Sequence, residues 1–171
     1  QVKARDVHLP ANVGVWGTDQ SPLQLYNLPG LLGGRYTRDA WREIWRVYLG
    51  LVALLDHSLG LIVDELKAQG IYDESLIVFT SDHGEMLGSH MLWQKMCMYE
   101  ESVRVPLFIK PPAGRKRVLA SRTAALTSHV DILPTVLDYA GRPVPRGVAG
   151  RSLRPAIEGR PWKRDRAFIQ F

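Results

Sequence analysis

The sequence predicts an α/β fold in which a mostly parallel or mixed sheet is flanked by helices, with only part of a domain present. A long helical pattern of apolar residues leads directly into the apolar run 76–79, which has the character of a buried strand. A second strand-like run follows at residues 103–110, and a helix followed by a buried strand is half of a βαβ unit. The composition, 46% hydrophobic and 23% charged over 171 residues, is that of a folded chain.

Residues 1–36 are predicted to be an irregular segment from a longer chain. Prolines and glycines interrupt this segment throughout, and no hydrophobic period persists beyond a few positions. An irregular stretch of this length is unusual inside a compact domain unless it is functional or lies against something else. The sequence also begins without a methionine, which agrees with this expectation.

A long amphipathic helix is predicted from Thr37, as its N-cap, to Lys67, with Gly70 as the stop signal. Asp56 falls inside the apolar stripe of this helix. Because an unsatisfied buried carboxylate is costly, we expect Asp56 to tie the helix to a neighbouring loop.

Three further elements are predicted after the strand at 76–79. Residues Val103–Lys110 read as a second strand, with Pro106 near its start or on an edge. A helix is predicted from Asp131, as its N-cap, to Ala140. Residues 166–171 read as a strand that the chain end truncates.

Charge, cysteine content and hydropathy exclude several classes of site. Lys and Arg outnumber Asp and Glu by 22 to 17, a net charge of +5 that suits anionic partners without specifying one. Cys97 is the one cysteine, so an internal disulfide and a multi-thiolate zinc site are impossible. The longest apolar candidate, residues 48–63, is interrupted by Asp56 and His57, so we expect no membrane span. The compartment is not predicted.

The residues after the first strand are candidates for a metal site. Asp82 and His83 follow the run that ends at Thr80, and ligands of open α/β sheets gather beyond the carboxyl ends of strands. A carboxylate and an imidazole suit a divalent cation, although the same residues also suit an ordinary turn. Lys95 would hold an anionic group beside that cation, or lie exposed on the surface. His90 is either a third metal ligand or a hydrogen-bonding residue that fixes the loop.

Three other polar positions are given structural interpretations. Glu100 and Glu101 are adjacent, and adjacent side chains diverge, so we expect them to be solvated or paired with Arg104 rather than to form an acid–base pair. Cys97 is expected to be a small buried hydrophobe.

The order and spacing of these segments resemble the sulfatases of the alkaline phosphatase superfamily over roughly residues 40–171. The segments that carry the resemblance are 48–70, 80–90 with Lys95 beyond it, 99–107, 129–138 and 150–153. The resemblance implies an alkaline phosphatase-like fold, and it implies that residues 37–171 form the C-terminal portion of a sulfatase-like catalytic domain. It also implies hydrolysis of a small-molecule or saccharide sulfate ester.

The resemblance assigns roles to three residues. In that family the pair matching Asp82 and His83 binds a divalent cation, usually calcium, and the lysine matching Lys95 contacts the sulfate. Calcium prefers oxygen ligands, so the histidine leaves manganese or zinc as alternatives.

The family's nucleophile is expected outside this chain. Sulfatases carry a Cys/Ser-x-Pro-x-Arg signature that is converted to formylglycine, and neither Cys97 nor any serine here matches it. We therefore expect formylglycine and further metal ligands on the remainder of the catalytic domain, and no activity from this fragment alone. A phosphonate monoester or phosphodiester hydrolase of the same superfamily is the alternative. A non-catalytic polyanion-binding fragment is another, but the arginines are dispersed, so we expect no nucleic acid partner.

Overall fold

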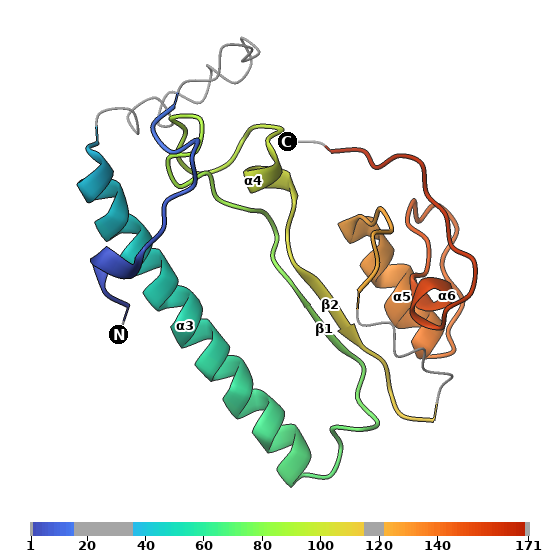
Figure 1. Ribbon diagram of the computed structural model, residues 1–171. Helices are drawn as coiled ribbons and strands as arrows, with labels where there is room; N and C mark the ends of the chain where they lie inside the picture. Colours follow the sequence, from blue (N-terminus) through green and yellow to red (C-terminus); the bar gives the residue numbers. More distant parts are fainter. Residues whose placement is uncertain (1, 16–35, 115–121, 170–171) are drawn as a thin grey trace. The chain divides into compact units, whose positions relative to one another are not determined.

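The computed structural model describes residues 2–15, 36–114 and 122–169. The elements follow in the order η1 (Ala4–Asp6), α3 (Arg38–Ala68), β1 (Ile77–Thr80), α4 (Glu100–Val103), β2 (Leu107–Lys110), η3 (His129–Asp131), α5 (Ile132–Tyr139) and α6 (Arg154–Ile157) (Figure 1). The chain divides into two compact units. The first unit comprises residues 1–69 and 80–107, and the second comprises residues 70–79 and 108–170.

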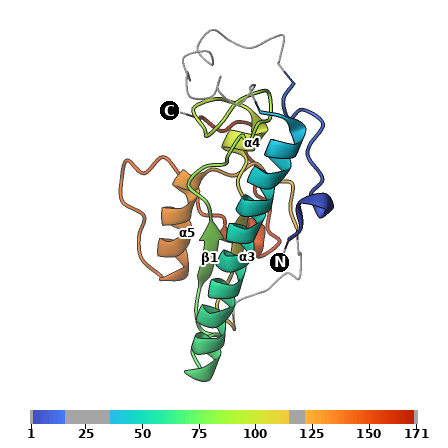
Figure 2. The ribbon, with the colours of Figure 1, turned by 90° about the vertical axis from the view of Figure 1, so that its left-hand side faces the viewer.

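Helix α3 begins and ends where its capping residues predict. The side chain of Thr37 accepts a hydrogen bond from the Ala40 amide at 3.2 Å. At the other end Gly70 adopts a φ of +70°, the left-handed conformation that ends many helices. Both caps are local, and both are confirmed. The short helix η1 packs against α3, which Figure 2 shows along its full length.

One face of α3 is apolar and exposed. The exposed large residues on this face include Val47, Leu51, Leu54, Leu55, Leu61 and Ile62. Asp56 is exposed as well, so the expected contact between this residue and a neighbouring loop is wrong. An exposed carboxylate is solvated by water and needs no partner within the protein. Within the described residues, α3 is also the helix that is long and apolar enough to cross a membrane. Core helices of soluble proteins can be equally long and apolar, so this feature is weak evidence for a membrane span.

Strands β1 and β2 form an antiparallel pair. The Thr80 hydroxyl, at the end of β1, donates to the Pro106 carbonyl at 2.9 Å, and Lys110, at the end of β2, donates to the Ser75 carbonyl at 3.0 Å. An antiparallel pair fits a mixed sheet. The strand residues are half-buried, except for the exposed Phe108, rather than buried on both faces.

The expected strand at Val103–Lys110 begins only at Leu107. Residues Glu100–Val103 form helix α4 instead, because the Tyr99 carbonyl accepts the amides of both Ser102 and Val103. The two donors close a helical turn before the chain can extend.

The second unit contains α5, whose bounds agree with the predicted helix to within one residue at each end. Asp131 precedes α5, but its side chain accepts a hydrogen bond from the Ser128 amide at 2.9 Å and does not cap α5. The terminal strand is wrong in its described part: residues 166–169 are irregular and Phe168 is 87% exposed. A strand requires a neighbour for its backbone groups, and the described sheet offers none there.

Candidate functional site

Asp82 and His83 lie immediately beyond the end of β1, and their side chains converge. The Asp82 carboxylate accepts a hydrogen bond from the His83 amide at 2.9 Å, and the Ser81 hydroxyl donates to the His83 carbonyl at 2.8 Å. Asp82 Oδ2 and His83 Nε2 are 3.3 Å apart. Two potential ligand atoms therefore lie side by side.

Both ring nitrogens of His83 lie near oxygen acceptors. Nδ1 is 2.8 Å from the Gly84 carbonyl, and Nε2 is 3.3 Å from Asp82 Oδ2. A tautomer that donates from Nδ1 to that carbonyl would present Nε2, beside the Asp82 carboxylate, to a cation. The pKa of Asp82 lies below its ordinary value, mainly because the His83 amide donates to the carboxylate, and the positive charge of Lys95 contributes to the lowering. An ionised carboxylate and a neutral imidazole nitrogen suit a divalent cation.

Gly84 is required by a close approach of the backbone. A Cβ atom at this position would lie 1.9 Å from the Glu101 carbonyl oxygen. The Gly84 amide donates to the Ser102 carbonyl at 2.8 Å, which fastens the chain after His83 to α4. The glycine thus fixes the direction in which the chain leaves the candidate metal ligands.

Lys95 lies on a loop, residues 86–98, with a strained backbone. Five of its non-glycine residues have positive φ angles between 44° and 75°: Leu87, His90, Met91, Gln94 and Met96. Such a conformation costs an L-residue about 1–2 kcal/mol. Three buried side chains of the loop itself, those of Met86, Leu92 and Cys97, form a small hydrophobic cluster. Cys97 is thus the predicted buried hydrophobe, and burial raises the pKa of its thiol.

His90 contacts residues that fix this loop. Its Nε2 lies 3.1 Å from Asn12 Nδ2 and 3.6 Å from Glu101 Oε1, and its ring stacks on Tyr99 at 4.0 Å. Asn12 Nδ2 donates to Glu101 Oε1 at 2.6 Å, so one amide bridges the N-terminal segment and α4. Among the described residues no three His, Cys, Asp or Glu side chains gather as a metal site. The structure brings Asp82 and His83 together and gives His90 other partners.

One of these interactions departs from the sequence analysis. Glu100 pairs with Arg104 at 3.3 Å as expected, but Glu101 is only partly exposed and bonds to Asn12. Asn12 was missed, because an asparagine in an irregular segment carries no local signal of such a contact.

A cavity of about 640 Å³ lies between α3 and the end of β1, within the first unit. Asp82, His83 and Glu85 line one side of it, and Val47 and Leu51 of α3 line another. The candidate metal ligands therefore face an open space with an apolar wall.

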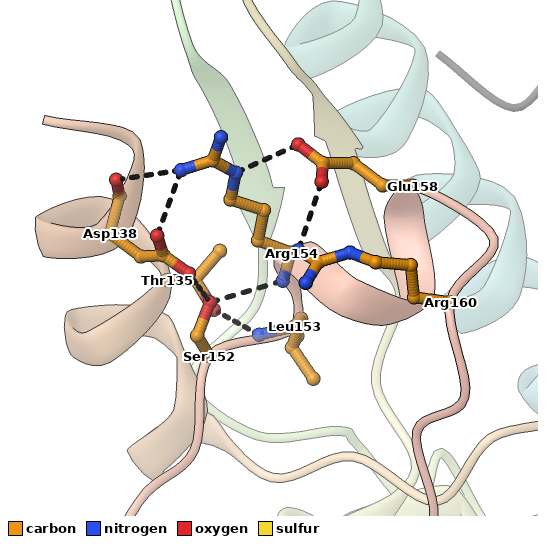
Figure 3. A network of polar contacts seen from close by, with 7 residues as sticks. All are labelled: Thr135, Asp138, Ser152, Leu153, Arg154, Glu158 and Arg160. Carbon is orange, nitrogen blue, oxygen red and sulfur yellow. Dashed lines mark hydrogen bonds and ion pairs between the residues drawn. The ribbon is translucent and has the colours of Figure 1, made fainter. Parts of the chain in front are cut away.

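A second group of charged residues surrounds Arg154 in the second unit (Figure 3). Arg154 donates to Asp138 at 2.9 Å and to Glu158 at 2.7 Å, and Ser152 donates to Asp138 at 2.6 Å. Burial raises the pKa of Asp138, but the Ser152 hydrogen bond and the Arg154 charge outweigh it and lower that pKa overall. The Arg154 hydrogen bond lowers the pKa of Glu158. These contacts join α5 to α6 and give the group a structural role.

The chain matches known proteins over most of its length. The family model described as Sulfatase matches residues 16–142. The multifunctional alkaline phosphatase superfamily protein PehA of Trinickia caryophylli is 40% identical over 121 residues, which are 70% of this chain and 23% of that protein. The N-acetylglucosamine-6-O-sulfatase of Bacteroides thetaiotaomicron is 39% identical over 118 residues, which are 69% of this chain and 21% of that protein.

The solved structures agree. The phosphonate monoester hydrolase from Silicibacter pomeroyi is 38% identical, with a TM-score of 0.70 over 76% of this chain and 25% of that one. The chain thus spans about a quarter of the length of the relatives that it matches. Its fold is part of an alkaline phosphatase-like domain. This chain belongs to the sulfatase family of the alkaline phosphatase superfamily.

Proposed function

We propose that this chain is part of a longer enzyme that hydrolyses a sulfate ester. In this proposal Asp82 and His83 hold a divalent cation, and Lys95 contacts the sulfate group. The observation that carries the proposal is the convergence of Asp82 Oδ2 and His83 Nε2, 3.3 Å apart on the wall of a cavity. The positive charge of Lys95, the smallest of the effects that lower the pKa of Asp82, supports it.

The cation is proposed to be calcium, with manganese or zinc as alternatives. The donor set fits: the Asp82 carboxylate has a lowered pKa and lies beside His83 Nε2, and a neutral imidazole nitrogen is a common metal ligand. A bound divalent cation would supply Lewis-acid stabilisation of anionic oxygens. Because imidazole suits manganese and zinc better than calcium, elemental analysis of the purified longer enzyme decides among the three.

Lys95 supplies the positive charge that this chain adds to the reaction. Its ammonium group would hold an oxygen of the sulfate and stabilise negative charge that develops on it. The formylglycine nucleophile is proposed to lie on the remainder of the catalytic domain.

The remainder of that domain is also the proposed partner of helix α3. The exposed apolar face of α3 is a surface of the kind that a folded protein covers. Because the chain spans about a quarter of its relatives, most of a related domain is available to cover this face. Packing of this kind would explain the exposed apolar face of α3 without requiring a membrane.

A saccharide or small-molecule sulfate ester is the proposed substrate. The similarity to the N-acetylglucosamine-6-O-sulfatase supports a saccharide. A phosphonate monoester or phosphodiester is the second candidate, because the phosphonate monoester hydrolase is similar to the same degree, at 38% identity. Sulfate and phosphonate esters present similar tetrahedral anions to a cation and a lysine.

The test compares kcat/KM of the longer enzyme on an aryl sulfate and on a matched phenyl phosphonate. A higher value for the sulfate supports the proposal, and a higher value for the phosphonate supports the second candidate. The isolated 171-residue chain is expected to release no sulfate. Sustained turnover by this chain alone would show that the missing nucleophile is not required. Salt-sensitive binding to a polyanion without turnover in either protein would favour a binding fragment instead.

A further inference from the structure

Glu85 lies between the candidate metal ligands and the loop that carries Lys95, and the proposed chemistry gives it no role. Its Oε1 atom accepts a hydrogen bond from the Gln94 amide at 2.5 Å and a longer one from the Leu87 amide at 3.3 Å. Both donors belong to residues with positive φ angles, 65° at Gln94 and 44° at Leu87. One carboxylate oxygen thus binds two strained positions of the same loop.

The Gln94 amide is the contact that matters for Lys95, because Gln94 directly precedes it. The Gln94 carbonyl accepts a hydrogen bond from the Met86 amide at 2.8 Å, so residues 85 and 86 hold both backbone polar groups of Gln94. Lys95 is flanked on its other side by Met96, whose φ is 75°. A lysine between two left-handed residues depends on such contacts to keep its backbone in place.

We propose that Glu85 is a positioning residue that sets the distance between the cation ligands and Lys95. Glu85 is two residues from His83, and through the Gln94 amide it fixes the start of the Lys95 backbone. The metal side and the anion side of the site are therefore linked by one side chain. This inference rests on the proposed function, in which Lys95 contacts the sulfate.

A competing role is direct. Glu85 lines the same cavity as Asp82 and His83, and a carboxylate there would also suit a metal ligand or a proton acceptor. The two roles differ in what they need from the side chain. Positioning requires an oxygen acceptor at the right reach, whereas a direct role requires the negative charge.

Two substitutions in the longer enzyme separate these requirements. Glu85→Gln keeps the reach and an acceptor oxygen but removes the charge, and we expect kcat/KM and the inhibition constant of inorganic sulfate to stay near wild type. Glu85→Asp keeps the charge but shortens the reach, and we expect sulfate to inhibit more weakly and kcat/KM to fall by about tenfold to a hundredfold. The opposite order, with Gln the more damaging, would overturn the proposal.

A Lys95→Ala background tests whether Glu85 acts through the lysine. There, Glu85→Asp is expected to cause no further loss of kcat/KM, because the positioned group is gone. Additive losses would contradict a positioning role. If Lys95→Ala alone leaves kcat/KM and sulfate inhibition unchanged, the proposed function of Lys95 fails, and the role of Glu85 fails with it. If Glu85→Asp does not fold, a large loss in Glu85→Gln still overturns the proposal.

Discussion

The two groups of charged residues in this chain differ in how their charges are satisfied. Around Arg154, the side chains are partly buried, 21% exposed for Arg154 and 10% for Glu158, and they bond to one another across two helices. Asp82, by contrast, is 82% exposed, and the hydrogen bonds that it accepts come from its immediate neighbours. A group whose charges are satisfied internally stabilises a fold, whereas a charge facing a cavity remains available to a ligand.

The two units also differ in which residues adopt positive φ angles. In the described part of the second unit, positive φ angles occur only at glycines, such as Gly141 and Gly147. In the first unit, leucine, histidine, methionine and glutamine adopt them in the loop 86–98. Strain persists where surrounding contacts enforce it, and it gathers at functional sites. The comparison therefore favours a structural role for the Arg154 group and supports the proposed functional role of the Lys95 loop.

The largest effect is expected from Lys95→Ala in the longer enzyme. Loss of an ammonium group that stabilises developing charge should lower kcat/KM for a sulfate ester by about 10²- to 10³-fold. Thermal unfolding should be unchanged, because Lys95 is exposed. A variant that lost stability rather than activity would remove the distinction between the two groups.

Arg154→Ala should show the reverse pattern. It leaves two carboxylates, Asp138 and Glu158, without their shared donor, and losing hydrogen bonds between charged groups costs about 1.5–3 kcal/mol. We expect faster hydrogen–deuterium exchange in α5, with kcat/KM little changed in the folded fraction. Arg146→Ala, at an exposed position, is the matched control and should leave exchange as it is.

Gly88→Ala and Gly147→Ala form a pair with similar backbones. Their φ angles are +88° and +90°, but a Cβ at Gly88 would lie 2.7 Å from the Trp41 ring, whereas one at Gly147 meets nothing within 4 Å. The shared strain costs about 1 kcal/mol, and the clash adds about 2 kcal/mol at Gly88 alone. Unfolding by urea measures the difference. Equal effects would show that Trp41 does not constrain the Lys95 loop.

The smallest effect is expected from acid. The pKa values of Asp138 and Glu158 lie below their ordinary values of 3.8 and 4.5, so their contribution to stability is present above that range and is lost as the pH falls through their folded pKa values. Protection of α5 against hydrogen exchange should therefore decline below about pH 4. In an Asp138→Asn, Glu158→Gln variant this decline should be weaker. An unchanged decline would assign it to other carboxylates.

Local signals predicted part of this structure correctly. The caps at Thr37 and Gly70 depend on bonds within four residues, so the sequence alone places α3. The burial of Cys97 was also predicted correctly, from its residue type alone. The position of Asp82 and His83 after a strand indicated a ligand site, and that assignment stays a prediction.

Other features were not predicted. Helix α4 replaced the start of the predicted strand: the Tyr99 carbonyl closes its turn, and the Gly84 amide, 18 residues from Ser102 in the chain, donates to the Ser102 carbonyl. The terminal strand did not form, because backbone groups need a neighbour that the described sheet lacks.

The sequence by itself determined the long helix, the strand before Asp82 and the family of the chain, since these depend on periodicity, capping and short motifs. Only the tertiary structure assigned Asn12 to Glu101, 89 residues away, and Glu85 to the Gln94 amide. The physical reason is that a side-chain hydrogen bond to a non-neighbouring residue depends on where the folded chain brings its atoms, and residue types alone do not specify that approach.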